Sequence, residues 1–179
     1  GCQKKIAKDI IQKEADYILM VKDNQKELKQ QVGKMFQIGE ISDTHTQVDA
    51  GHGRVETRKC DVISDLNFMD AKEEWPGLNR IVRVQSERYD KQTSKSSIQS
   101  RYYISSGRYN AEQVNNSVRQ HWSIENNLHW SLDVIFKEDE SLKKKGHSPK
   151  NYNIILKMAL AMIDKEKSSK ASKPVKRLN

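Results

Sequence analysis

The chain has 179 residues, of which 35% are hydrophobic and 31% charged, and its formal net charge of +8 favours a polyanionic partner. No stretch approaches the roughly 18 apolar residues of a membrane span, and no secretory leader opens the chain, so we expect a cytoplasmic protein with no membrane partner. Cys2 and Cys60 lie too far apart in the sequence to indicate a zinc site or a disulfide framework.

The first residues predict a helix followed by a strand. Residues 1–14 carry isoleucines on one side and lysines on the other, which is typical of an amphipathic helix. Residues 16–22, DYILMVK, form a short apolar run that is rich in β-formers. Such a run predicts a strand buried on both faces, as in a sheet flanked by helices.

A second helix is expected to follow this strand. Asp23 or Asn24 can serve as its N-cap. Its buried face is expected to consist of Leu28, Val32 and Phe36. The order of helix, buried strand and helix predicts an α/β layer arrangement.

Residues 40–106 have a different pattern. From Thr44 to Leu66, polar residues alternate with β-branched residues around Gly51-His52-Gly53, which predicts a hairpin. Two more strands are expected at residues 80–87 and 101–105, joined by a polar loop over residues 89–100. Strict alternation predicts a sheet with one face on a core and the other exposed. We therefore predict a mostly antiparallel β region that is inserted within, or added to, an α/β core.

Two helices are expected to close the fold. The first spans residues 110–136, and Asn110 and Gln113 at its start have the spacing of a capping box. The second has Pro149 in its first turn. Its buried stripe is expected to consist of Ile154, Ile155, Met158, Ala159, Met162 and Ile163. The basic residues 167–179 are expected to form a disordered tail after a domain that spans residues 1–166.

Four titratable side chains recur every four residues along the helix expected at residues 110–136. They are His121, Glu125, His129 and Asp133, and on a helical wheel Glu125 falls in the middle of the apolar arc. Burying an unpaired carboxylate is costly, so Glu125 needs a cation, a metal ion or the edge of a cleft. The pattern leaves two interpretations open, namely a structural hydrogen-bond network with His121 or His129 and a catalytic metal ligand.

The sequence of this helix also resembles a known family. The run HWSIENNLHWSLDVIFKED resembles the signature helix of bacterial insertion-sequence transposases of the DDE type, most closely the H-repeat-associated transposases. Other blocks resemble the same family in the same order along nearly the whole chain: GCQKKIA, ADYILMVKDNQ, GHGRVETR, EEWPGL, RYYISS and SPKNYNIILKMAL. Collinear blocks are far more specific than any single one.

The resemblance implies an RNase H-like core, partial in this chain, with the inserted antiparallel β region and the C-terminal helices around it. In this family two aspartates and one glutamate hold Mg²⁺ or Mn²⁺, and Glu125 matches the glutamate. Two such ions about 3.5–4 Å apart can activate the attacking oxygen and stabilise the leaving one. The implied activity is cleavage and strand transfer of double-stranded DNA at insertion-sequence ends.

The two aspartates of the family have no counterpart in the chain. The second precedes the segment that matches Gly1-Cys2-Gln3 and the first lies further upstream, whereas Asp9, Asp16 and Asp23 stand at other positions. We therefore expect the C-terminal piece of a transposase, which binds the metal pair poorly and hardly cuts DNA alone. The alternative is a catalytically dead remnant that serves as a DNA-binding or interaction module.

Residues near the expected strand ends are candidates for DNA contacts. Lys22, Asn24 and Gln25 follow the strand expected at residues 16–22 and should lie at its C-terminal end, where α/β sheets place ligands.

Two arginines of the hairpin are further candidates. Arg54 and Arg58 alternate with Glu56 onto one strand face. This arrangement suits either DNA phosphates or a solvated face with an internal ion pair.

Two histidines of the signature helix complete the set. His121 stands where related transposases often have an arginine, and it can donate to a phosphate when protonated; His129 follows two turns later. The resemblance also implies the DNA of insertion-sequence ends and targets as partner and a homodimer as the assembly.

Overall fold

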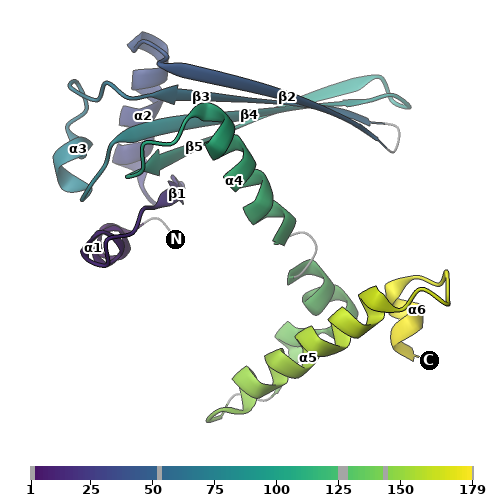
Figure 1. The fold of residues 1–179 in the computed structure, drawn as a ribbon. Helices are drawn as coiled ribbons and strands as arrows, with labels where there is room; N and C mark the ends of the chain where they lie inside the picture. Colours follow the sequence, from purple (N-terminus) through teal and green to yellow (C-terminus); the bar gives the residue numbers. More distant parts are fainter. Residues whose placement is uncertain (1–2, 52–53, 125–128, 143–144, 179) are drawn as a thin grey trace. The chain divides into compact units, whose positions relative to one another are not determined.

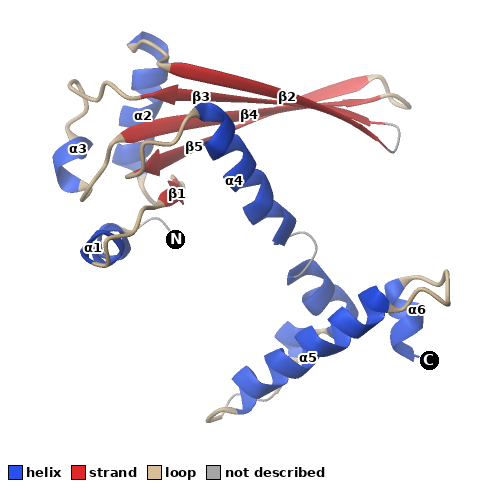
Figure 2. Cartoon of the chain, in the orientation of Figure 1, coloured by secondary structure: helices blue, strands red, loops and turns tan. Residues whose placement is uncertain are grey.

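The computed structural model describes residues 3–51, 54–124, 129–142 and 145–178 (Figure 1). The chain divides into two compact units, residues 1–118 and residues 119–179, and each is described by itself. Strands and helices build the first unit, whereas the second is helical in the part that the structure describes (Figure 2). None of the described helices is long and apolar enough to cross a bilayer.

A five-stranded sheet organises the first unit. Its strands are β1 Ile18–Met20, β2 Asp43–Gly51, β3 Arg54–Ile63, β4 Arg80–Asp90 and β5 Lys95–Ser105. Their order in the sheet is β1-β5-β4-β3-β2, and every neighbouring pair is antiparallel. The predicted mixed α/β class is confirmed at this level.

The predicted hairpin is confirmed, since β2 and β3 pair from Asp43↔Val62 to Gly51↔Arg54. The two later strands also form, but the loop expected over residues 89–100 is wrong. β4 and β5 continue to pair as far as Asp90↔Lys95, and only residues 91–94 form the turn. Residues 95–100 are exposed, so this part of β5 lacks the apolar alternation that marks a half-buried strand.

The expected division into one buried and one exposed sheet face is wrong as well. At the helix-covered end, Ile81 and Val82 point to opposite faces of β4 and both are fully buried. Towards the turns, consecutive residues from Lys95 to Ser100 are all exposed. Burial therefore changes along the strands rather than across the sheet.

The strand predicted within residues 16–22 forms, but its expected burial on both faces is wrong. β1 has three residues and lies at the edge of the sheet, where it pairs with β5. Its residues are half-buried, while Tyr17 and Val21 are buried just outside it. β1 is thus part of the antiparallel sheet and does not form a separate α/β layer in the described residues.

The helices of the first unit are α1 Lys4–Gln12, α2 Lys26–Ile38, α3 Ala71–Glu74 and the start of α4, Ala111–Ile124. The predicted helices at residues 1–14 and after Asn24 are confirmed, but the predicted N-cap of α2 is wrong. Gln25 occupies that position without a side-chain cap. Asp23 instead accepts a hydrogen bond from Lys29 Nζ at 2.6 Å.

One face of the sheet packs against α2, and we call it the α2 face. Phe36 of α2 stacks on Tyr102 of β5, with ring centroids 5.8 Å apart. The guanidinium of Arg83 lies 4.8 Å from the centroid of the Phe36 ring, a cation–π contact. Ile63, Ile81 and Ile104 are fully buried apolar residues of this face.

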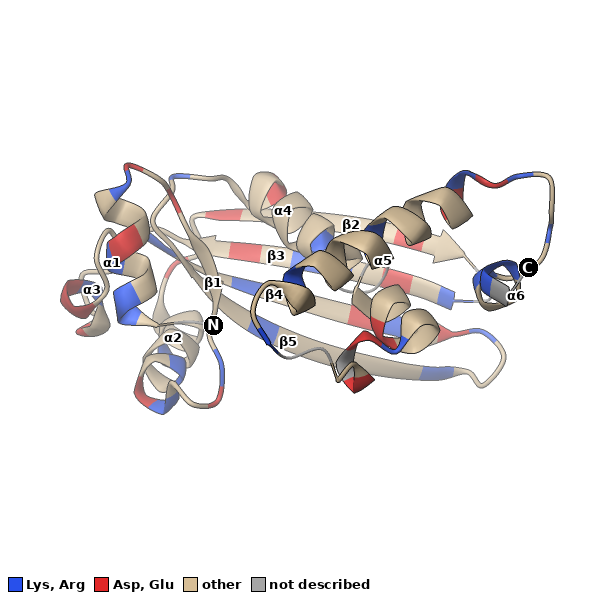
Figure 3. Ribbon diagram, turned by 90° about the horizontal axis from the view of Figure 1, so that it is seen from below, with Lys and Arg blue, Asp and Glu red and all other residues tan. Residues whose placement is uncertain are grey.

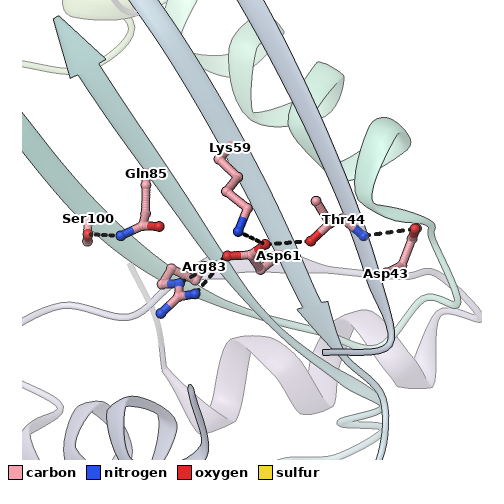
Figure 4. Close-up of polar contacts among 7 residues, drawn as sticks. All are labelled: Asp43, Thr44, Lys59, Asp61, Arg83, Gln85 and Ser100. Atoms are coloured by element: carbon pink, nitrogen blue, oxygen red, sulfur yellow. Dashed lines mark hydrogen bonds and ion pairs between the residues drawn. The ribbon is translucent and has the colours of Figure 1, made fainter. Parts of the chain in front are cut away.

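Asp61 is fully buried on the α2 face and is held by three neighbours (Figure 4). Thr44 Oγ1 donates to Asp61 Oδ1 at 2.5 Å, and Arg83 donates twice to Oδ2, at 2.8 and 3.2 Å. Lys59 Nζ lies 3.1 Å from Oδ1. Burial alone raises the pKa of Asp61, but the hydrogen bonds from Thr44, Arg83 and Lys59 outweigh it and hold the pKa below 3.8.

Trp75 fills the turn between α3 and β4, next to Pro76-Gly77. Its side chain is 1% exposed. Gly77 has a φ of 72°, and a Cβ there would lie 2.7 Å from Ile11 Cδ1 of α1. The turn therefore needs glycine both for its backbone conformation and for its close contact with α1.

The second unit contains a π-helix, η2 Ser131–Ile135, a 3₁₀ turn, η3 Glu138–Glu140, and the helices α5 Ser148–Lys165 and α6 Lys173–Leu178. The long helix predicted at residues 110–136 is helical on both sides of residues 125–128, which lie outside the described residues. Pro149 stands in the first turn of α5, as predicted.

The buried side of α5 differs from the prediction. Leu156 and Leu160 are buried against η2. Of the predicted stripe, Ala159 and Ile163 pack partly against this cluster. The other members are exposed: Ile154, Ile155, Met158 and Met162. The prediction failed because α5 is apolar on more than one side, and helical periodicity alone does not say which side η2 covers.

Within residues 167–179, the segment expected to be a disordered tail, the structure has the short helix α6. Lys173 Nζ lies 2.7 Å from Asp164 Oδ1 of α5. The guanidinium of Arg177 lies 5.3 Å from the centroid of the Phe136 ring. Two basic side chains of this segment therefore contact an acidic side chain and an aromatic ring.

Replacing Asp61 tests how far its network stabilises the first unit. We expect Asp61→Asn to lower the free energy of unfolding by about 3 kcal/mol, because Arg83 and Lys59 lose a buried carboxylate. The loss is measured by urea denaturation at pH 7, with the exposed Asp65→Asn as control. Because the pKa of Asp61 is lowered in the fold, the difference in free energy of unfolding between the native protein and Asp61→Asn should shrink as the pH falls below 3.8.

Cys60 offers a second test of the packing. Its side chain is fully buried, and burial, with the carboxylates of Asp61 and Asp43 adding to it, raises the pKa of the thiol to about 12. In a Cys2→Ser variant we expect Cys60 to react with a thiol reagent at pH 8 at least about 10²-fold more slowly when folded than in urea. Equal rates in both states would contradict this packing.

Candidate catalytic helix and DNA-binding residues

The helix that leads to Glu125 begins at a capping box. Gln113 N–H donates to Asn110 Oδ1 at 2.8 Å, and Asn110 N–H donates to Gln113 Oε1 at 3.0 Å. These two bonds satisfy donors that the start of a helix leaves unpaired. The predicted capping box is therefore confirmed.

The first turns of α4 are anchored on the sheet face opposite to α2. Ala111 N–H donates to Asp43 Oδ2 at 2.7 Å. Asn115 is buried, and its Nδ2 lies 3.1 Å from Nδ1 of His45 in β2. His45 is paired in register with Cys60, and we call the face that they share the α4 face.

Buried apolar residues complete this anchor. Val114 and Val118 of α4 are buried, and so are Val62, Val82 and Tyr103 of the sheet. The anchor thus combines a cap, two polar contacts to β2 and apolar packing. It fixes the first turns of α4 on the sheet of the first unit.

Glu125 lies outside the described residues, so its predicted roles stay predictions. On the N-terminal side of residues 125–128, His121 is exposed. Its ring centroid lies 6.2 Å from that of Trp122, which is half-buried. On the C-terminal side of residues 125–128, His129 and Trp130 are exposed. Both candidate histidines are therefore at the surface of the second unit.

Lys22, Asn24 and Gln25 lie directly after β1. Val21 N–H still donates to Tyr102 O at 2.8 Å, and Gln25 N–H donates to Lys22 O at 2.9 Å, so the chain turns at once into α2. Lys22 and Asn24 are exposed, whereas Gln25 is half-buried.

Arg54 and Arg58 lie at the turn end of β3 and do not join this group. Arg58 Nη2 donates to Asp49 Oδ2 at 2.5 Å, and its Nε lies 4.0 Å from Glu56 Oε1. Arg54 Nε lies 3.6 Å from Asp90 Oδ2. The internal ion pair that the sequence left open as an alternative is therefore present, although it does not exclude a phosphate contact at the more exposed Arg54.

Two further cations share this end of the sheet, and the sequence analysis did not single them out. Arg88 pairs in register with Glu56, and Lys95 pairs with Asp90, so both lie on the same α4 face as Arg54. Arg88 comes directly after the strand predicted at residues 80–87, and Lys95 falls within the loop predicted at residues 89–100, where no apolar alternation indicates a strand. Acidic and basic residues occur together along these strands (Figure 3).

The metal site expected from the family has one ligand in this chain, Glu125. Among the residues that the structure describes, no group of three or more His, Cys, Asp or Glu side chains could hold a metal ion. The described residues therefore do not complete the expected carboxylate set.

Comparison with known proteins gives the family. A family model described as a transposase DDE domain matches residues 1–162. The chain belongs to the DDE transposase family. No solved structure matches the chain.

Curated relatives agree with this assignment. The chain is 38% identical over 170 residues to YncI of Escherichia coli O157:H7, which is named as a candidate transposase; the match covers 91% of the chain and 43% of YncI. It is 34% identical to YbfL of Escherichia coli K12, over 96% of the chain and 47% of YbfL. It is 33% identical to the H repeat-associated candidate transposase YhhI of the same strain, over 96% of the chain and 47% of YhhI. The chain thus spans less than half the length of these relatives.

The capping box of α4 can be tested directly. We expect Asn110→Ala to destabilise the first unit by about 1 kcal/mol, because Gln113 N–H loses its acceptor. Asn116→Ala is the matched control, since Asn116 is exposed in the interior of the same helix, where alanine is favoured. Thermal unfolding followed by circular dichroism should show a lower midpoint for Asn110→Ala alone.

Proposed function

We propose that the chain is the glutamate-bearing C-terminal part of a transposase that cleaves and joins DNA at insertion-sequence ends. The match of the family model to residues 1–162 is the observation on which this proposal rests. In it, Glu125 binds Mg²⁺ or Mn²⁺ together with two aspartates from the rest of the protein. The match of the run around Glu125 to the signature helix of the family supports this role.

The position of β1 supports an RNase H-like core. β1 lies at one end of the sheet, and among the described strands it pairs with β5 only. Its residues Ile18, Leu19 and Met20 are apolar and half-buried. An open apolar edge of this kind accepts further strands, so we propose that strands of the complete core, with the two aspartates, add at this edge.

Under this proposal, the chain alone binds DNA but does not cleave it. One carboxylate ligand is a weak site for a hard divalent ion, which needs several oxygen ligands. The metal, when bound, would stabilise the developing charge on the reacting phosphate. The residues of this chain hold one ligand for it and bind the DNA.

The proposed DNA contacts are the exposed or partly exposed groups described above: Lys22, Asn24, Gln25, Arg54, Arg58, His121 and His129. Lysine and arginine would pair with phosphates, and the amides would donate to phosphate or sugar oxygens. Since Arg58 is held by Asp49, it would mainly orient the acids around Arg54. We also propose that the complete protein acts in the cytoplasm as a homodimer on paired DNA ends.

The test uses a chimaera in which the missing N-terminal part is supplied by that of YncI, joined at the aligned position. We expect Mg²⁺-dependent cleavage of insertion-sequence end DNA, and a loss of cleavage on the order of 10³-fold in Glu125→Gln, because a metal ligand contributes several kcal/mol. Glu112→Gln is the control, since Glu112 is an exposed carboxylate in the first turn of α4. Cleavage that survives Glu125→Gln would remove Glu125 from the chemistry.

A further inference from the structure

The turn end of the sheet has two unlike faces. On the α4 face, the basic residues are Arg54, Arg58, Arg88, Lys95 and Arg101, and the acidic residues are Asp49, Glu56 and Asp90. On the α2 face beyond the Asp61 network, the residues are mainly apolar or hydroxylated, with Val48, Val55, Tyr89 and Ile98 beside the single charge of Glu87. Cations are therefore concentrated on one side of this part of the sheet.

Three of these cations line a cavity, which we call the tip pocket. Its volume is about 390 Å³, and its lining residues are Arg54, Arg88, Asp90, Lys95, Ser96 and Ser97. The side chains of Arg54 and Arg88 are 69% and 60% exposed. The pocket thus combines two guanidinium groups, one ammonium group and two hydroxyls with a single carboxylate.

The acids near the tip pocket hold its cations only loosely. Arg54 Nε lies 3.6 Å from Asp90 Oδ2, and Arg88 Nε lies 3.6 Å from Glu56 Oε2. Pairs of this length at exposed groups contribute little stability. The cations can therefore turn towards a stronger anion without a large cost.

Asp90 has a structural role that explains why an acid occurs in a basic pocket. Its Oδ1 accepts N–H bonds from Gln92 and Thr93, at 2.9 and 3.0 Å, which close the β4–β5 turn. Glu56 similarly lies between Arg58 and Arg88, at 4.0 and 3.6 Å. Asp90 and Glu56 each also bind groups that do not line the tip pocket. The two carboxylates therefore do not neutralise all three cations of the pocket.

We propose that the tip pocket binds a phosphate of the duplex DNA backbone through Arg54, Arg88 and Lys95, with Ser96 and Ser97 donating hydrogen bonds. A guanidinium fork matches two phosphate oxygens, and an ammonium group adds a further charge-assisted bond. This inference rests on the proposed function, because that proposal supplies DNA as the partner, and it adds Arg88 and Lys95 to the contacts.

The surroundings of the pocket favour a polymer over a small phosphate. Arg58 and Arg101 continue the basic character along the α4 face beyond the pocket. A free phosphate would contact only the pocket, whereas a DNA backbone can follow the cations along the strands. Under this proposal, the tip pocket is one end of a longer contact between the α4 face and the DNA backbone.

The experiment compares two double variants of the 179-residue chain that remove the same charge. Arg88→Gln with Lys95→Gln alters the tip pocket; Lys8→Gln with Lys34→Gln alters exposed lysines of α1 and α2. Binding of a 20-base-pair duplex is followed by fluorescence anisotropy between roughly 50 and 200 mM salt. Circular dichroism confirms that both variants keep the native fold.

We expect the tip variant to bind duplex DNA about 30- to 100-fold more weakly and to lower the slope of log K against log salt by about two, because two phosphate contacts are lost. The Lys8 and Lys34 variant should change affinity less than about threefold. Arg88→Lys, which keeps the charge but loses the fork, should fall between the native protein and the tip variant.

The outcomes separate this inference from the proposed function. If the native chain binds no DNA, the proposed function fails and this inference with it. If the native chain binds DNA and both double variants lose the same affinity, only the tip pocket is overturned. If inorganic phosphate binds the native pocket while DNA affinity is unchanged in the tip variant, the pocket takes a free phosphate and the assignment to DNA is wrong.

Discussion

The unbroken antiparallel register of β3, β4 and β5 is the constraint on which the rest of the first unit depends. From Ile63↔Ile81 to Arg54↔Asp90, the β3–β4 pairing has no bulge, so each strand keeps the same alternation between its two faces. A slip of one residue would move Asp61 to the α4 face and the cations to the α2 face. The buried Asp61 opposes such a slip, because only the native register supplies Arg83 and Thr44 as partners.

This register gives the sheet two functions along its length. At the covered end, α2 and the start of α4 bury opposite faces of the sheet. At the turn end, residues 87–89 and 91–100 are exposed, and the cations Arg54, Arg88 and Lys95 of the α4 face are exposed as well. The same sheet thus holds the start of α4 at one end and a proposed DNA contact at the other.

Much of the first unit could be predicted from the sequence. The hairpin and the capping box of Asn110 followed from local patterns, because turn glycines and cap spacing act over a few residues. The edge position of β1 and the length of β5 could not be predicted. Strand order is a long-range property, and the exposed residues 95–100 have no apolar period to reveal a strand.

The sequence by itself determined the family, because the collinear blocks and the signature run can be recognised without coordinates. It also singled out Glu125, because this acidic residue falls on the apolar arc of the helical wheel. Only the tertiary structure decided which cations act together. Arg54 is far in the chain from Arg88 and Lys95, and the three meet because three strands align them in register on one face. Pairing between strands, which local sequence does not encode, creates that pocket.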